Sequence, residues 1–132
     1  MRNFSILIFF IVIFIGSFSY AKCYDGKDYK GQIENNQAHG YGLAKWESKK
    51  KYIGSWRNNK MDGHGIYYFD VNSYYYGQFE KGDFTGYGVM IYANGKKKEG
   101  LWKNDSLVTA TTLDDTILIY ALDAAMKAEK YC

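Results

Sequence analysis

Few side chains of this 132-residue chain have the types and spacing that a catalytic or metal site needs. The two histidines, His39 and His64, have no third ligand at metal-binding spacing, so no zinc site is expected. No serine stands in a nucleophile-elbow pattern. Acidic residues such as Asp62, Asp70 and Glu80 are scattered over turns, and nothing selects an acid–base pair among them. The chain is therefore predicted not to be an enzyme and to need no cofactor or metal.

Three Gly-x-Gly tripeptides suggest a nucleotide-binding loop, but they lack its third glycine and lie between strands rather than before a helix. They are Gly40-Tyr41-Gly42, Gly63-His64-Gly65 and Gly86-Tyr87-Gly88, each 23 residues after the last. A second set of glycines keeps the same step, at Gly31, Gly54, Gly77 and Gly100. Such a period predicts a stacked array of repeats in which the glycines are structural.

Each 23-residue unit is predicted to form one β-hairpin. In the second unit, residues 52–57 alternate sides with period two, residues 58–62 form a turn and residues 64–69 form a second strand. Tyr52 and Gly54 share one face, and the glycine leaves room for aromatic rings from neighbouring strands. Successive hairpins then give a mainly β fold, a single-layer antiparallel β-meander of about seven strands.

The repeated order is Tyr-x-Gly-x-Trp, a polar turn, Gly-x-Gly, an aliphatic residue, an aromatic residue and a second turn. This order resembles the MORN repeat (membrane occupation and recognition nexus). The corresponding segments are an N-terminal cap at 22–28, repeats at 29–51, 52–74 and 75–97, and a partial fourth repeat at 98–111. Ile33 replaces the usual Trp and Lys98 the usual leading Tyr, as expected for the end units of an array. The resemblance implies scaffolding, protein–protein contact and, in some members, membrane association.

The first 21 residues are predicted to be a secretory signal peptide. Arg2 gives a positive start, residues 6–15 form an unbroken apolar run, and small residues precede a cleavage site after Ala21. The protein is therefore expected to be exported, either to a periplasm or out of the cell. The alternative is an uncleaved membrane anchor formed by residues 6–20.

The two cysteines, Cys23 and Cys132, lie near the two ends of the expected mature chain. Export permits a disulfide bond between them, and two free thiols are the alternative. The bridge would close a loop of roughly 110 residues and stabilise the fold by about 4–5 kcal/mol on the chain-entropy model.

The last segment, 112–132, changes period and predicts a C-terminal capping helix from about 112 to 130. The residues spaced for one helical face are Leu113, Ile117, Tyr120, Ala121, Ala124 and Ala128. Thr112 with Asp115 fits a variant of the capping box. The helix is expected to cover an apolar sheet face or an open sheet edge, and docking to a partner is the alternative.

Two runs of lysine occupy nearly the same hairpin turn, two repeats apart. They are Lys49, Lys50, Lys51, Lys96, Lys97 and Lys98. We expect them on one edge of the sheet, roughly 19 Å apart, because neighbouring strands are spaced by about 4.8 Å. There they would contact anionic lipid head groups or an acidic partner, and solvated turns are the alternative. The formal net charge of only +3 argues against a nucleic-acid partner.

Aromatic residues recur in three columns at the same step. The columns are Tyr41, His64 and Tyr87, then Trp46, Phe69 and Tyr92, then Trp56, Phe79 and Trp102. The first two columns form a candidate binding surface for a peptide or for sugar rings, and internal packing is the alternative. The predicted function is an exported MORN-like interaction module that binds a protein partner through its repeat surface. A peripheral membrane binder is the first alternative, and a carbohydrate-binding module or an uncharacterised hydrolase is the second.

Overall fold

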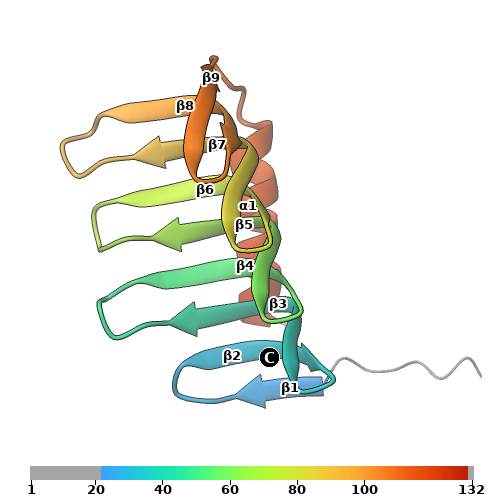
Figure 1. The fold of residues 1–132 in the computed structure, drawn as a ribbon. Helices are drawn as coiled ribbons and strands as arrows, with labels where there is room; N and C mark the ends of the chain where they lie inside the picture. The colour runs from blue at the N-terminus through green and yellow to red at the C-terminus, as the bar shows by residue number, and fades with distance from the viewer. Residues whose placement is uncertain (1–21, 131–132) are drawn as a thin grey trace, which may run out of the picture.

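The computed structural model describes residues 22–130, which form one sheet and one helix (Figure 1). Within these residues, nine strands pair in sequence order, each antiparallel to the next. The strands are β1 (Lys22–Asp25), β2 (Tyr29–Glu34), β3 (Gln37–Lys45), β4 (Lys51–Arg57), β5 (Lys60–Tyr68), β6 (Tyr74–Glu80), β7 (Asp83–Ile91), β8 (Lys97–Lys103) and β9 (Ser106–Ala110), and the helix is α1 (Thr116–Lys130). The predicted single-layer β-meander with a C-terminal helix is confirmed. The predicted signal peptide and Cys132 lie outside the described residues.

Within the described residues, the sheet has nine strands rather than the expected seven because pairing continues past the repeats at both ends. β1 falls in the segment expected to be a cap and pairs with β2. β9 follows the last repeat strand and pairs with β8. The edge of a sheet presents unpaired backbone N–H and C=O groups, so a flanking segment can pair there without any aromatic pattern of its own.

Two-residue turns close the hairpins along one side of the sheet. They are Asn35-Asn36, Asn58-Asn59, Lys81-Gly82 and Asn104-Asp105, and all eight residues have φ between 49° and 92°. Positive φ at both positions is the type I′ turn, whose twist matches that of the flanking strands. The turn expected over residues 58–62 is therefore shorter, and β5 already begins at Lys60.

One face of the sheet, here the aromatic face, is packed by its own rings. Tyr52 and Tyr75 are fully buried there. Gly54 and Gly65 are paired in adjacent strands beneath the Tyr52 ring, and a Cβ on Gly65 would lie only 2.6 Å from Cζ of that ring. The Tyr52 hydroxyl donates a hydrogen bond to the Ser55 carbonyl at 2.9 Å. These glycines do make room for a ring, but the ring beside Gly54 is that of Tyr52 from the same strand rather than one from a neighbouring strand.

Tryptophan side chains link neighbouring repeats on the aromatic face. Trp56 Nε1 donates to the Gly42 carbonyl at 3.0 Å, and Trp102 Nε1 donates to the Gly88 carbonyl at 3.0 Å. Each acceptor belongs to the Gly-x-Gly strand of the preceding repeat. The indole thus satisfies its own donor while its ring covers the neighbouring strand.

The type I′ turns make a second link between repeats. The Asn59 N–H donates to the Ala38 carbonyl at 3.0 Å, and the Asn59 Oδ1 accepts from the Ala38 N–H at 2.7 Å. Asp105 makes the same pair of bonds with Phe84, at 3.2 and 2.8 Å. Gly82 stands at the equivalent position and makes only the backbone bond, at 2.9 Å, because it has no side chain.

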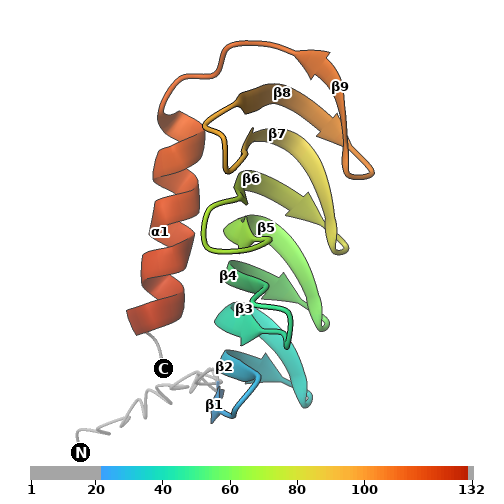
Figure 2. The same ribbon diagram turned by 90° about the vertical axis from the view of Figure 1, so that its left-hand side faces the viewer.

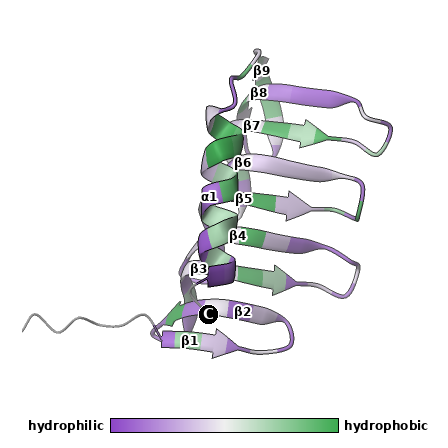
Figure 3. Ribbon diagram, turned by 180° about the vertical axis from the view of Figure 1, so that it is seen from behind, coloured by the Kyte–Doolittle hydropathy of each residue, from purple (hydrophilic) through white to green (hydrophobic). Residues whose placement is uncertain are grey.

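The opposite face, here the helix face, is covered by α1, which lies across β3 to β6 (Figures 2 and 3). The helix presents four buried alanines to the sheet, Ala121, Ala124, Ala125 and Ala128. Small side chains let the helix lie close to Ile53 and Ile66, which are buried with them. Within residues 22–130, no helix combines the length and apolar content needed to cross a membrane.

The predicted start of the helix at 112 is wrong, since α1 begins at Thr116. The Asp114 Oδ1 accepts a hydrogen bond from the Thr116 N–H at 2.9 Å, so Asp114 rather than Thr112 satisfies an N–H group at the start of the helix. The Leu113 N–H donates to Glu99 Oε2 at 3.3 Å, which holds this segment on β8. Thr112 and Asp115 therefore form no capping box, and Leu113 lies on no helical face. Tyr120, expected on the buried side, is 51% exposed.

Candidate functional site

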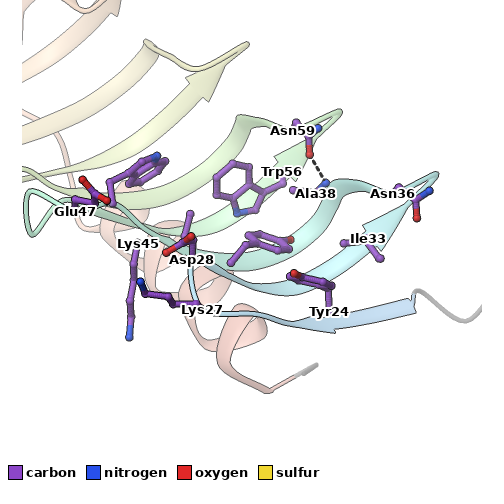
Figure 4. Close-up of a pocket in the computed structure, with 13 residues that line it drawn as sticks. Tyr24, Lys27, Asp28, Ile33, Asn36, Ala38, Lys45, Glu47, Trp56 and Asn59 are labelled. Atoms are coloured by element: carbon purple, nitrogen blue, oxygen red, sulfur yellow. Dashed lines mark hydrogen bonds between the residues drawn. The ribbon is translucent and has the colours of Figure 1, made fainter.

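The aromatic face is open at its N-terminal end, because the first repeat has no preceding repeat to cover its rings. A groove of about 690 Å³ follows β2 and β3 there, from Glu47 at one end to Asn36 at the other (Figure 4). Four aromatic side chains line it, namely Tyr24, Tyr29, Trp46 and Trp56. The groove therefore runs the length of a strand rather than forming a closed cavity.

The four rings are fixed at different depths. Tyr29 meets Trp56 edge to face, with ring centroids 5.4 Å apart, and Trp56 is buried. Tyr24 stacks on Tyr29 at 6.5 Å, and Trp46 contacts Tyr67 at 6.0 Å. Tyr24 and Trp46 are 52% and 44% exposed. The buried Trp56 and the partly buried Tyr29 thus form a floor, and two half-exposed rings stand at its sides.

Burial raises the pKa of Tyr29 to about 12, so its phenol stays protonated at alkaline pH where a free tyrosine would ionise. The Tyr29 hydroxyl donates a hydrogen bond to the Gln32 carbonyl at 2.7 Å. This bond and the Trp56 indole bond hold both floor rings in place. A rigid aromatic floor lets a ligand bind without first ordering the side chains that it contacts.

The rim of the groove is charged, with both signs present. Lys27 and Asp28 come from the turn between β1 and β2, Lys45 from the end of β3 and Glu47 from the turn that follows (Figure 4). The Lys45 N–H donates to the Asp28 carbonyl at 2.8 Å, which ties the two segments together. A mixed rim around an aromatic floor suits a polypeptide, which carries both charges and apolar side chains, better than a polyanion.

The predicted column Trp46, Phe69 and Tyr92 lies at the strand ends of the aromatic face. Phe69 packs edge to face on Tyr67 and Phe84, with centroids 4.9 and 5.9 Å away, and belongs to the core. Trp46 and Tyr92 are 44% and 36% exposed. Only Trp46 of this column also lines the groove.

The predicted column Tyr41, His64 and Tyr87 lies on the helix face instead. Tyr41 packs against the cluster under α1, with Lys127 Nζ 5.4 Å from its ring centroid. The His64 ring lies 5.2 Å from that of Tyr120, and burial lowers the pKa of His64. Tyr87 is 47% exposed. The structure therefore separates the two predicted columns onto opposite faces of the sheet.

Both lysine runs lie on the same side of the sheet, in the β3–β4 and β7–β8 turns and at the first residues of β4 and β8 (Figure 1). Three of the lysines contact side chains of the sheet: Lys51 Nζ lies 4.3 Å from the Tyr68 ring centroid, Lys98 Nζ lies 5.9 Å from the Tyr92 ring centroid, and Lys97 Nζ lies 3.1 Å from Glu99 Oε1. The other three, Lys49, Lys50 and Lys96, are exposed in the turns.

The family model of the MORN repeat matches residues 29–50, 52–74 and 75–97, together a little more than half of the chain. The chain belongs to the MORN repeat family. MORN repeats are general repeats for interaction with proteins or membranes, and the family is non-catalytic. No curated protein matches this chain.

The sequence pattern of the MORN repeats did not reveal that Tyr24 and Tyr29 belong to the groove. The available signal is that the first repeat of an array has one uncovered side, so its leading tyrosine must be open there. The hydrogen bonds that the hairpin turns make to the neighbouring repeat were also missed, although Asn35-Asn36, Asn58-Asn59 and Asn104-Asp105 all fit the 23-residue step.

Two further predictions concern metal and disulfide sites in this MORN protein. Among residues 22–130, no three His, Cys, Asp or Glu side chains lie close enough together to hold a metal ion. Cys23 lies in β1, whereas Cys132 is outside the described residues, so their bond stays a prediction.

Proposed function

We propose that this protein is an exported MORN-repeat interaction module that binds an extended segment of a protein partner in the groove on its aromatic face. The observation that carries the proposal is the pair of half-exposed rings, Tyr24 and Trp46, beside the floor formed by the partly buried Tyr29 and the buried Trp56. Large rigid rings supply contact area at a low cost in conformational entropy and are typical anchors of protein interfaces.

The shape of the groove supports an extended occupant. It follows the strands β2 and β3 and is open along its length, so a chain segment can lie in it without folding. The charged rim can then contact the partner's polar groups at either end, through Lys27 and Glu47 at one end and Asn36 at the other. Fixed rings and a polar rim reproduce the usual anatomy of a protein interface.

Capture of partners from the protein's native compartment tests this function. The wild type and a Val71→Ala control, altered at a 78% exposed site in the β5–β6 turn, should retain the same proteins. The double variant Tyr24→Ala with Trp46→Ala should retain at least about tenfold less, because such anchors contribute about 2 kcal/mol or more. Equal capture by the double variant would contradict the proposal, as would specific hits on a glycan array without any protein partner.

The export and disulfide predictions add a link between the two ends of the fold. Cys23 lies in β1, and α1 contacts β2 and ends at Lys130, two residues before Cys132 (Figure 2). Intact mass should show a chain that begins at Lys22 and gains two hydrogens on reduction. A chain that still begins at Met1 would contradict cleavage of the signal peptide, and thiols that alkylate without a reductant would contradict the disulfide.

Membrane association is the second candidate, favoured by Lys49, Lys50 and Lys96, which are exposed on one edge. Vesicles with anionic phospholipid should then float the protein at low salt. Charge reversal of these three lysines to glutamate should reduce flotation at least about tenfold, since each basic residue near the surface contributes about 1 kcal/mol. Flotation that survives the reversal, or none at low salt, would exclude this candidate.

A further inference from the structure

The outer side of α1 carries a second apolar stripe. Ile119, Leu122 and Met126 are 60%, 45% and 62% exposed, while the alanines on the other side of the helix are buried against the sheet. Figure 3 shows α1 as the outermost layer of the helix face, with its N-terminal turns coloured as hydrophobic. A helix that only covers a sheet needs one apolar stripe, so the second stripe requires its own explanation.

The spacing of the three residues makes the stripe continuous. Positions i, i+3 and i+7 lie above one another on a helix, so Ile119, Leu122 and Met126 form one row about two turns long. Asp115 lies one turn before this row, and Lys130 lies one turn after it. The stripe therefore has an acidic end and a basic end.

We propose that α1 pairs antiparallel with α1 of a second copy of this protein, about a two-fold axis between positions 122 and 123. In this register Ile119 of each copy faces Met126 of the other. Asp115 of each copy faces Lys130 of the other, so the acidic end of each stripe meets the basic end of its neighbour. A two-fold interface must be self-complementary, and this stripe has that property in both its apolar and its charged residues.

The remaining charges near the axis are compatible with such a pair. Asp123 is paired with Lys127 of the same helix, with Oδ2 and Nζ 2.8 Å apart, so the two copies do not bring bare carboxylates together. Antiparallel helices also oppose their macrodipoles favourably. The carboxylates of Asp123 and Glu129 on α1, and that of Asp115 directly before it, argue against an anionic membrane as the occupant.

Sedimentation equilibrium of the purified protein, whose N-terminus is first established by intact mass, tests the pairing. The weight-average mass should rise with concentration from that of a monomer to twice that value. Ile119→Asp should raise the dissociation constant at least about tenfold, because it places a charge in the apolar row. Val71→Asp, a matched change at a more exposed valine, should leave the constant unchanged.

Charge exchange tests the register separately. Asp115→Lys and Lys130→Asp should each weaken dimers severalfold by opposing like charges, and the double variant should restore the wild-type constant. Both changes also oppose the helix macrodipole, so loss of helix stability alone would make the double variant worse. A protein that stays monomeric, or a dimer unaffected by Ile119→Asp, would overturn the pairing. Additive losses in the double variant would overturn the antiparallel register.

Discussion

The two faces of the sheet are stabilised by different means. On the aromatic face, rings of successive repeats contact one another, as in the edge-to-face contact of Tyr52 with Phe79, whose centroids are 4.8 Å apart. On the helix face, Ile53 and Ile66 are buried by a single element, α1, that lies outside the repeat. The aromatic face is therefore stabilised by contacts between neighbouring repeats, whereas the helix face depends on the single covering helix.

This difference assigns separate roles to the faces. In a repeat array each unit is covered by its neighbours, so the aromatic face is closed in the middle and open at the first repeat. The groove lies at that opening. The helix face is closed from outside, and the surface that remains for contact there is the outer side of α1. The comparison predicts that damage to the aromatic face spreads through the array, whereas damage to the helix face stays local.

The largest effect is expected from Gly65→Val, which would place atoms in the volume of the Tyr52 ring. We expect a loss of about 3 kcal/mol in the free energy of unfolding, at the upper end of the cost of overpacking. Urea unfolding followed by tryptophan fluorescence measures it. Gly95→Asn is the control, because a Cβ at Gly95 meets nothing within 4 Å, and its change should stay within about 0.5 kcal/mol. If Gly65→Val lowered the free energy of unfolding by less than about 1 kcal/mol, the Tyr52 ring would not be tightly packed.

A smaller and more local effect is expected from Ala121→Leu, a fully buried position of α1. The longer side chain should push the helix from Ile53 and Ile66 at a cost of about 2 kcal/mol. Amide hydrogen exchange should speed up in α1, while β7 and β8, which α1 does not cover, keep their protection. Glu129→Ala, exposed on the same helix, serves as the control. Equal loss of protection in the helix and in all strands would contradict the separation of the two faces.

The helix face should also respond to acid through His64, which lies against Tyr120. Burial lowers the pKa of His64 below its ordinary value of 6.5, so the unfolded chain takes up the proton first as the pH falls. This contribution to stability is therefore present above about pH 6.5 and is lost below it. As the pH falls from about 7.5 to about 5, the unfolding free energy of wild type should decrease relative to that of His64→Gln. Parallel curves would contradict burial of the neutral ring.

The smallest expected effect is a gain. Gly82→Asn should provide the side-chain hydrogen bond that Asn59 makes at the equivalent turn. The φ of Gly82 is +92°, and after glycine asparagine tolerates a positive φ best. We expect about 0.5–1 kcal/mol of added stability. The reciprocal change Asn59→Gly should lose about 1 kcal/mol, because it removes the acceptor of the Ala38 N–H. A thermal unfolding series of both variants measures the pair, and shifts in the same direction would contradict the role of the turn.

The aromatic face could be predicted from the sequence because its determinants repeat. Gly54, Tyr52 and Trp56 recur at a fixed step, and period-two alternation places them on one face. The start of α1 could not be located in this way, because the Asp114 carboxylate captures the Thr116 N–H and the sequence also offered Thr112 as a cap. The strands β1 and β9 were missed because edge pairing uses backbone groups that leave no side-chain signature.

The candidate site was only partly accessible to sequence reasoning. Trp46 was identified from its column, but His64 of the other column packs under α1 on the far face. The alternation of sides along β3 places Tyr41 and Trp46 on opposite faces of the sheet. The separation of the two columns could therefore have been predicted from the sequence. The groove itself could not be predicted from a residue pattern, because it arises where a neighbouring repeat is missing.

Hydrogen exchange of the protein bound to a captured partner tests the central claim most directly, namely that the open end of the aromatic face is the binding site. The account predicts slower exchange over residues 24–29 and 44–47 in the complex, with α1 and the β7–β8 turn unchanged. Protection confined to α1, or to the lysine-bearing turns, with residues 24–29 exchanging as in the free protein, would contradict it.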